Sequence, residues 1–216
     1  MILTRPLVYL VAISGVFLLA NCATQPTGPQ YTAEGKLINP PPPGTYEHFT
    51  AEENYPKTFD VWKDQALLDQ TNAGNSSIIV SLSKQRAFLM NGDKVVMDYP
   101  ISSGIPSRPT PPGTYYILEK TVDKHSNKYG RIYDAEGNVV NSDADSTKDP
   151  IPEGGKFVGA AMPYWMRMSN DGIGHHIGPL PKSRRAASHA CIRGPRSVVP
   201  TVFSKVKNGT RVVVVE

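Results

Sequence analysis

The sequence predicts a mostly β domain, of the sandwich or open-barrel class, with one short helix near its C-terminal end. Short runs of β-branched and aromatic residues recur along the last two thirds of the chain, which is typical of strands. The 216 residues include 20 prolines and 18 glycines, so turns are frequent. This length suits one domain with accessory segments, and no internal repeat is evident.

The N-terminus has the pattern of an export signal. Arg5 precedes a continuous apolar run, residues 7–20, which is short for a membrane span and typical of a signal-peptide core. Cys22 follows directly in Leu19-Ala20-Asn21-Cys22, which resembles a bacterial lipobox, although Asn21 stands where that pattern has a small residue. We therefore expect a lipoprotein signal peptide over residues 1–21, with Cys22 lipidated. Ordinary cleavage nearby and an uncleaved anchor remain alternatives, and all three place the rest of the chain outside the cytoplasm, in the periplasm or at the cell surface.

Residues 22–75 are expected to form a tether followed by a short packing segment. The first part has few large apolar residues and a run of four prolines at 40–43, which predicts a semi-extended linker. The second part contains a possible amphipathic helix, Phe59–Gln70, that would pack on the domain.

Residues 76–216 are expected to form the domain itself. Its predicted strands cover Ile78–Ser83, Ala87–Met90, Lys94–Pro100, Gly113–Val122, Phe157–Met168 with a break at Pro163, and Arg211–Val215. Asn91-Gly92 predicts a two-residue hairpin turn, and Ser197–Val206 the late helix. Residues 123–155 are polar and rich in turn residues, so they form either a long loop that covers a functional site or a disordered insert.

The candidate chemistry lies in Ser188-His189-Ala190-Cys191-Ile192-Arg193, with the pair His175-His176 about fifteen residues upstream. A thiol is a nucleophile only as thiolate, and a nearby imidazole is the usual means of forming one at neutral pH. Small residues around the thiol would let backbone N–H groups face a reacting carbonyl. A buried inert thiol and a disulfide to Cys22 are the alternatives for Cys191.

The net charge and the spacing of possible metal ligands restrict the classes of partner and cofactor that we expect. The net charge of +4 favours an anionic wall polymer or a membrane surface. No basic stripe alternates with aromatic residues, so we expect no nucleic-acid partner. The histidines and Cys191 lack the paired spacing of a zinc site, and we expect no metal and no cofactor. The basic run 182–185 is expected to be a solvated loop.

The hexapeptide around Cys191 resembles the S-H-G-C-[IV]-R signature of the L,D-transpeptidase (YkuD-like) family, which cross-links cell walls. Further blocks resemble the family in the same order over about residues 77–215. They are Ile79–Leu82 with Gln85, Tyr99–Gly104, Thr110–Tyr115, Met162–Met166, Gly172–Gly178 and Gly209–Val213.

This resemblance implies an L,D-transpeptidase fold and a cysteine acyltransferase acting on peptidoglycan tetrapeptide stems. It implies that Cys191 is the nucleophile and His176 the general base, with His175 as the alternative register. An L,D-carboxypeptidase using the same site and a non-catalytic wall-binding lipoprotein are the other readings. The remaining site candidates are Ser188, His189 and Ala190 for the oxyanion hole and loop support, and Arg193, Tyr164 and Trp165 for substrate binding.

One departure from the family pattern bears on activity. Ala190 replaces the glycine of the signature. If this position needs a positive φ, alanine costs about 1 kcal/mol or more, and if φ is negative alanine is harmless.

Overall fold

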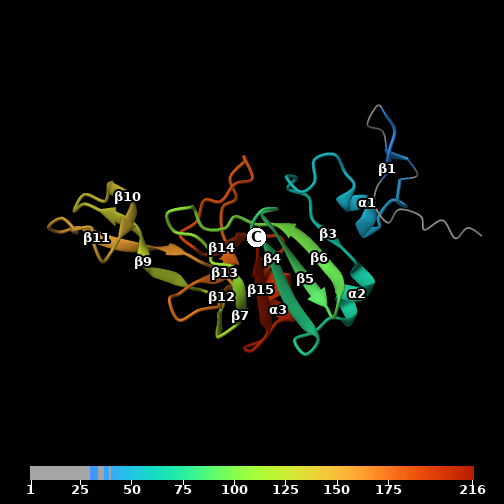
Figure 1. Cartoon of the computed structure of the whole chain (residues 1–216). Coiled ribbons are helices and arrows are strands. Elements are labelled where there is room, and N and C mark those ends of the chain that lie inside the picture. Colours follow the sequence, from blue (N-terminus) through green and yellow to red (C-terminus); the bar gives the residue numbers. More distant parts are fainter. Residues whose placement is uncertain (1–29, 34–36, 39) are drawn as a thin grey trace, which may run out of the picture. The chain divides into compact units, whose positions relative to one another are not determined.

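The computed structural model describes residues 30–33, 37–38 and 40–216 (Figure 1). The predicted signal peptide and the lipidation site at Cys22 lie outside the described residues. Within the described part of the chain, no helix is long and apolar enough to cross a membrane. Residues Pro41–Glu216 form one compact unit. Preceding it, β1 (Gln30–Tyr31) and β2 (Leu37–Ile38) pair antiparallel within the segment expected to be a linker.

The larger sheet of the compact unit has six strands in the order β3-β6-β5-β4-β15-β7. Their bounds are Trp62–Lys63 (β3), Ser76–Ser81 (β4), Arg86–Asn91 (β5), Lys94–Pro100 (β6), Gly113–Tyr116 (β7) and Arg211–Val215 (β15). All neighbours run antiparallel except β4 and β15, which pair in parallel inside the sheet. The β-branched runs of β4 and β15 supply buried side chains there, as the sequence predicts.

The β5–β6 hairpin turns one residue later than expected. Asn91 pairs with Lys94 and is the last residue of β5, so the two loop residues are Gly92 and Asp93. Gly92 has a φ of +60°, whereas Asp93 does not have a positive φ. A glycine at the first loop position is the type II′ arrangement, so the turn depends on Gly92 rather than on the Asn-Gly pair.

A second sheet of four strands holds the histidine pair. It contains β8 (Glu119–Thr121), β12 (Trp165–Arg167), β13 (Gly174–Ile177) and β14 (Ile192–Gly194), in the order β14-β13-β12-β8. The chain passes from the first sheet to the second between β7 and β8, where the N–H of Ile117 bonds to Thr210 and that of Leu118 to Arg167. β13 and β14 are parallel neighbours, which brings the segment after His175 beside the segment after Cys191.

The core lies between these sheets and α3 (Val199–Lys205), which is the late helix expected from the sequence. Its fully buried members include Val80, Leu89, Ile101, Met166, Ile192, Val199 and Val202. Lys120 from β8 donates to the carbonyls of Phe203 and Val206, at 2.6 and 2.5 Å, so a cation satisfies the C-terminal end of α3. The prediction of a mostly β fold is confirmed.

Two short helices precede the first long strand. They are α1 (Tyr46–Thr50) and α2 (Gln65–Gln70), so the described residues contain three helices, where the sequence predicted the late helix and a possible helix over Phe59–Gln70. Asp64 caps α2 through the N–H of Leu67, and Leu68 is buried in the core. The predicted helix over Phe59–Gln70 is therefore shorter, because its first part forms β3 against β6.

A fully buried ion pair fastens these early elements to the larger sheet. Arg86 of β5 pairs with Asp98 of β6, and both side chains are 0% exposed. The hydroxyls of Tyr46 and Tyr55 donate to the second oxygen of Asp98, each at 3.0 Å. These bonds compensate the cost of burying the carboxylate, which would be several kcal/mol if it were left unpaired.

The polar stretch 123–155 is neither a loop nor disordered. It builds most of a three-stranded antiparallel sheet, β10-β9-β11, which we call the β arm (Figure 1). Its strands are His125–Tyr133 (β9), Val139–Asp145 (β10) and Lys156–Ala161 (β11). Ile132 and Ala144 are the only buried apolar side chains of these three strands. The strands are therefore held together mainly by the backbone hydrogen bonds between them. Figure 1 shows the β arm projecting from the two main sheets.

Candidate active site

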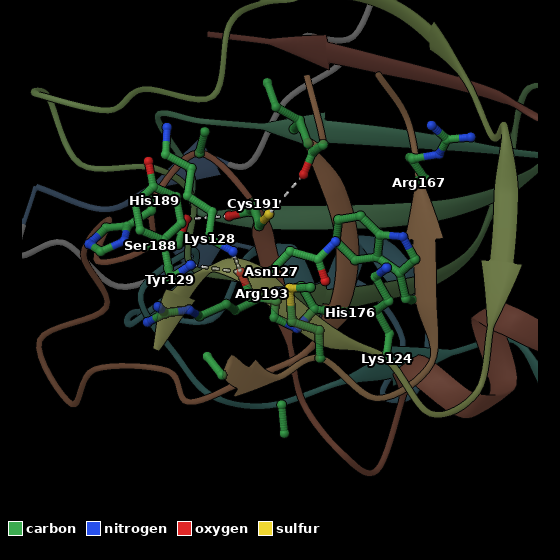
Figure 2. A pocket seen from close by; sticks show the side chains of 18 of the residues that line it. Lys124, Asn127, Lys128, Tyr129, Arg167, His176, Ser188, His189, Cys191 and Arg193 are labelled. Atoms are coloured by element: carbon green, nitrogen blue, oxygen red, sulfur yellow. Dashed lines mark hydrogen bonds between the residues drawn. The ribbon is translucent and has the colours of Figure 1, made fainter. Parts of the chain in front are cut away.

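Cys191 lines a cavity of about 590 Å³ at the junction of the four-stranded sheet and the β arm (Figure 2). It is the last residue before β14 and is only partly exposed. Its thiol donates to the carbonyl of Gly172 at 3.7 Å. His176, Ser188, His189, Ala190, Arg193 and Trp165 line the same cavity, so one space contains most of the predicted site residues.

The two histidines of the pair point in opposite directions because they are neighbours on β13. His176 lines the cavity with Cys191. His175 is buried in the core, where its Nε2 lies 3.0 Å from the Tyr99 hydroxyl and its Nδ1 lies 2.9 Å from the Ile192 carbonyl. The geometry therefore favours His176 over the alternative register.

A backbone carbonyl orients His176. Its Nδ1 lies 2.8 Å from the carbonyl oxygen of Ile177, which can only accept a hydrogen bond. The Nδ1 atom therefore carries the proton, and Nε2 is left with the lone pair that a base needs. Burial lowers the pKa of His176 to about 4, although its bond to Ile177 opposes this shift. The imidazole is thus neutral at physiological pH.

The thiol is also neutral in the resting site. Burial raises the pKa of Cys191, while a backbone hydrogen bond from Gly174 and the charge of Arg193 act in the opposite direction. A neutral thiol and a neutral imidazole that line the same cavity can exchange one proton when a substrate excludes the remaining water. The arrangement fits proton transfer coupled to nucleophilic attack.

The nucleophile loop, which we define as residues 184–191, is held by backbone bonds to the segment after β6. Ser103 accepts from the N–H groups of Ala187 and Ser188, both at 3.0 Å. The hydroxyl of Ser188 in turn donates to the carbonyl of Cys191. Ser188 is 1% exposed, so its role is to support the loop.

Ala190 has a φ of +73°, which is the left-handed region that favours glycine. Its carbonyl accepts from Thr110 Oγ1 at 2.7 Å, and a Cβ on Gly104 would lie 2.8 Å from its Cα. The sequence left open whether φ at residue 190 is positive or negative. The structure has the positive value, at which alanine is less favourable than glycine. Within the described residues, the backbone N–H groups of His189, Ala190 and Cys191 donate to no protein acceptor, which leaves them for an oxyanion.

His189 contacts the β arm. Its Nε2 lies 3.3 Å from a carboxylate oxygen of Asp143, and its ring meets Tyr129 edge to face at 4.5 Å. Burial lowers its pKa, and the charge of Asp143 opposes that shift. His189 therefore links the nucleophile loop to the β arm.

The substrate-binding candidates divide into two groups. Arg193 and Trp165 line the cavity, where Arg193 Nη1 donates to the Ala187 carbonyl at 3.0 Å. Trp165 is 2% exposed, and its Nε1 has no partner within the described part of the chain. Tyr164 does not line the cavity, because its ring packs against Phe203 of α3 at 5.3 Å.

Sequence reasoning missed the wall that the β arm contributes. Figure 2 shows Asn127, Lys128 and Tyr129 of β9, and Lys124 directly before β9, around the site. A signal for the arm was present, because Ile132-Tyr133 and Val139-Val140 flank a turn whose Gly137 has a φ of +87°. Five cationic side chains line the cavity against two carboxylates, Glu119 and Asp171, so its lining is positive. The cations are Arg108, Lys124, Lys128, Arg167 and Arg193.

Similar solved structures include an L,D-transpeptidase from Mycobacterium smegmatis (18% identity, 66% of this chain and 59% of that chain, TM-score 0.49). An L,D-transpeptidase from Stackebrandtia nassauensis (18%, 68% and 60%, 0.47) and a mutant L,D-transpeptidase from Enterococcus faecium (26%, 66% and 50%, 0.46) are also similar. The chain thus spans about half to three fifths of the length of these proteins. No curated protein sequence matches it. The model of the YkuD family, the L,D-transpeptidase catalytic domain, matches residues 75–214, and the chain belongs to this family.

Proposed function

We propose that this protein is a cysteine-dependent L,D-transpeptidase that acts on the tetrapeptide stems of peptidoglycan. The observation that carries the proposal is that Cys191 and an oriented His176 line one cavity, and that the backbone N–H groups of residues 189–191 have no acceptor among the described residues. A thiol, a base with a fixed tautomer and an oxyanion site are the parts that acyl transfer through a thioester requires. The positive lining suits a stem peptide that carries free carboxylates.

The first half of the reaction forms the thioester. Nε2 of His176 takes the proton of Cys191 as the sulfur attacks the carbonyl of the diamino-acid residue that precedes the terminal D-Ala. The N–H groups of His189, Ala190 and Cys191 stabilise the negative oxygen of the tetrahedral intermediate. The C–N bond then breaks, and the imidazolium of His176 returns the proton to the amine of the departing D-Ala.

The second half transfers the acyl group. An amine of another stem, or of a protein, loses a proton to His176 and attacks the thioester carbonyl. The C–S bond breaks, the imidazolium reprotonates the sulfur, and an amide is released. Water in place of the amine would give an L,D-carboxypeptidase, so the identity of the acceptor is a separate question for experiment.

The test is product analysis with the full chain. Tetrapeptide-rich wall fragments are incubated with the wild type and with Cys191→Ala, and the products are identified by mass. We expect cross-linked stems and free D-Ala from the wild type only. Trimmed stems alone would identify the carboxypeptidase, and binding with no new product would identify a wall-binding protein. Turnover by Cys191→Ala would refute the assignment of the nucleophile.

We also propose that the protein is exported and anchored to a membrane through Cys22. The apolar run ends at the right distance before this cysteine, and a proline-rich stretch follows it. Fractionation of cells that express the full chain should find it with membranes, and Cys22→Ser should release it or leave it unprocessed. A Cys22→Ser protein that is cleaved and distributed like the wild type would identify an ordinary signal peptide.

A further inference from the structure

Residues 56–60, which we call the N-terminal strap, are bonded to the larger sheet through their backbone. Arg86 Nη1 donates to the carbonyl of Thr58 at 3.2 Å, and Arg86 Nη2 donates to that of Asp60 at 2.8 Å. Because Arg86 is itself fixed by Asp98 inside the sheet, the strap has a defined position. The strap lies outside residues 75–214, which the family model covers.

Arg184 joins the strap to the nucleophile loop. Its Nε donates to Thr58 at 3.1 Å, Nη1 to Ile101 at 2.9 Å and Nη2 to Gln85 at 2.8 Å, and all three acceptors are backbone carbonyls. The side chain was expected in a solvated loop but is 3% exposed, and the ring of Phe59 covers its guanidinium at 5.1 Å. No carboxylate of the described residues lies within 4.0 Å of it. Its planar fork therefore connects three separate backbone segments rather than neutralising a charge.

The same network continues to the nucleophile. Gln85 Nε2 donates to Ser103 Oγ at 2.7 Å, and the N–H of Ser103 donates back to Gln85 Oε1 at 3.0 Å. Ser103 also holds the N–H groups of Ala187 and Ser188, and Ser188 bonds to the carbonyl of Cys191. Each step is a hydrogen bond between buried or partly buried groups. Losing the bonds of Arg184 would therefore make the backbone more mobile both at residue 184 and at residues 187–191.

We propose that Arg184 is a positioning residue that holds the nucleophile loop in its reactive conformation by fastening it to the N-terminal strap. The strap is then a working part of the active site, although it precedes the family domain. This inference rests on the proposed function, because the conformation in question aims the N–H groups of residues 189–191 at the reacting carbonyl. Lysine at position 184 would keep the charge but could not reach three carbonyls at once.

The test compares two reactions of Cys191 in the full chain. A carbapenem acylates the thiol only if its β-lactam oxygen finds the oxyanion hole, whereas iodoacetamide alkylates it without one. We expect Arg184→Lys to slow acylation by about tenfold or more while alkylation stays within about twofold. A small displacement of the loop lowers the rate of a reaction that needs aligned N–H groups far more than the rate of one that needs only an accessible thiol. Hydrogen exchange of the peptide containing Ala187 and Ser188 should become faster. Arg185→Met is the matched control, because Arg185 is exposed and its side chain makes no hydrogen bond or ion pair with any described residue.

Each outcome decides the proposal. Unchanged acylation and unchanged exchange in Arg184→Lys would overturn it, and so would an equal slowing of both reactions, which indicates general unfolding. If Arg184→Lys does not fold, Phe59→Ala removes the cover of the guanidinium while keeping its three bonds available. Phe59→Ala should raise the same exchange rates and slow acylation alone, and wild-type behaviour would refute the coupling. If the wild type forms no carbapenem adduct at Cys191, the proposed function fails, while the exchange measurement still tests the link to the strap.

Discussion

Ala190→Gly is expected to stabilise the protein. A left-handed backbone costs a non-glycine residue about 1–2 kcal/mol, and Ala190 has a φ of +73°. Glycine loses this strain but adds about 0.4–1 kcal/mol of unfolded-state entropy. The difference is a gain of about 0.5–1 kcal/mol in the free energy of unfolding, which corresponds to a rise of about 1–4 °C in Tm for a domain of this size. Acylation of Cys191 should stay within a few-fold of the wild type or increase.

The control for this prediction is Ala187→Gly in the same loop. Ala187 does not have a positive φ, and its N–H bonds to Ser103. Glycine there should lower the free energy of unfolding by about 0.5–1 kcal/mol. Thermal and urea unfolding measure both variants, and carbapenem acylation measures the site. If Ala190→Gly destabilises as much as Ala187→Gly, or loses most of its acylation rate, the methyl group of Ala190 packs the loop and the strain argument is wrong.

Three other predictions concern the titrating groups. His176→Ala should lower turnover by at least about 10²-fold. His175→Gln should mainly lower the free energy of unfolding and change turnover little, since His175 bonds only to core groups. If kinetics and urea unfolding give the reverse result, His175 is the base and the register is off by one. Because burial raises the pKa of Cys191, its alkylation by iodoacetamide, followed in the Cys191 peptide by mass, should still be increasing with pH at pH 9, and a plateau below pH 8 would contradict a neutral resting thiol. Burial lowers the pKa of His175 and His176 to about 4, so the unfolded chain binds more protons between pH 4 and 6.5, and stability should fall as the pH drops through that window. The loss is at most about 3 kcal/mol per histidine, and urea unfolding at constant stability from pH 6.5 to 4 would refute it.

The sequence predicts those parts of the fold that depend on local pattern. The β-branched runs of β4 and β15 and the late helix α3 lie where the residues indicate. Within the β arm, the sequence predicted a strand at β11 but missed β9 and β10, because these two strands carry few buried side chains and depend on backbone pairing, which produces no alternation of apolar residues. The buried Arg86–Asp98 pair was missed because charged residues within a strand are normally assigned to its solvent-exposed face, whereas these two are buried.

The candidate site shows the same division. The sequence predicted no strand at the histidine pair. Once the structure places β13 over residues 174–177, adjacent histidines must face opposite sides, so only one of them can face Cys191. Which one it is depends on the parallel pairing of β13 with β14, and that pairing joins segments whose proximity no local pattern reveals. The backbone φ of Ala190 and the buried position of Arg184 are likewise set by tertiary contacts.

The electrostatics of the site explain why these contacts matter for reactivity. Burial disfavours both the thiolate and the imidazolium, so the resting pair is neutral, and in the proposed reaction charge appears only as the sulfur attacks. In that proposal, the N–H groups of residues 189–191 stabilise the oxyanion, and the Ile177 carbonyl stabilises the imidazolium. Groups fixed in advance stabilise a transition state without reorganising, but only while the loop that carries them is held still. The strained φ of Ala190 and the buried guanidinium of Arg184 both affect the nucleophile loop, residues 184–191. The backbone of Ala190 adds strain to this loop, whereas the hydrogen bonds of Arg184 hold the loop in place. Combining Ala190→Gly with Arg184→Lys should therefore give a rate that differs from the product of the two single effects, because the two residues share one backbone segment.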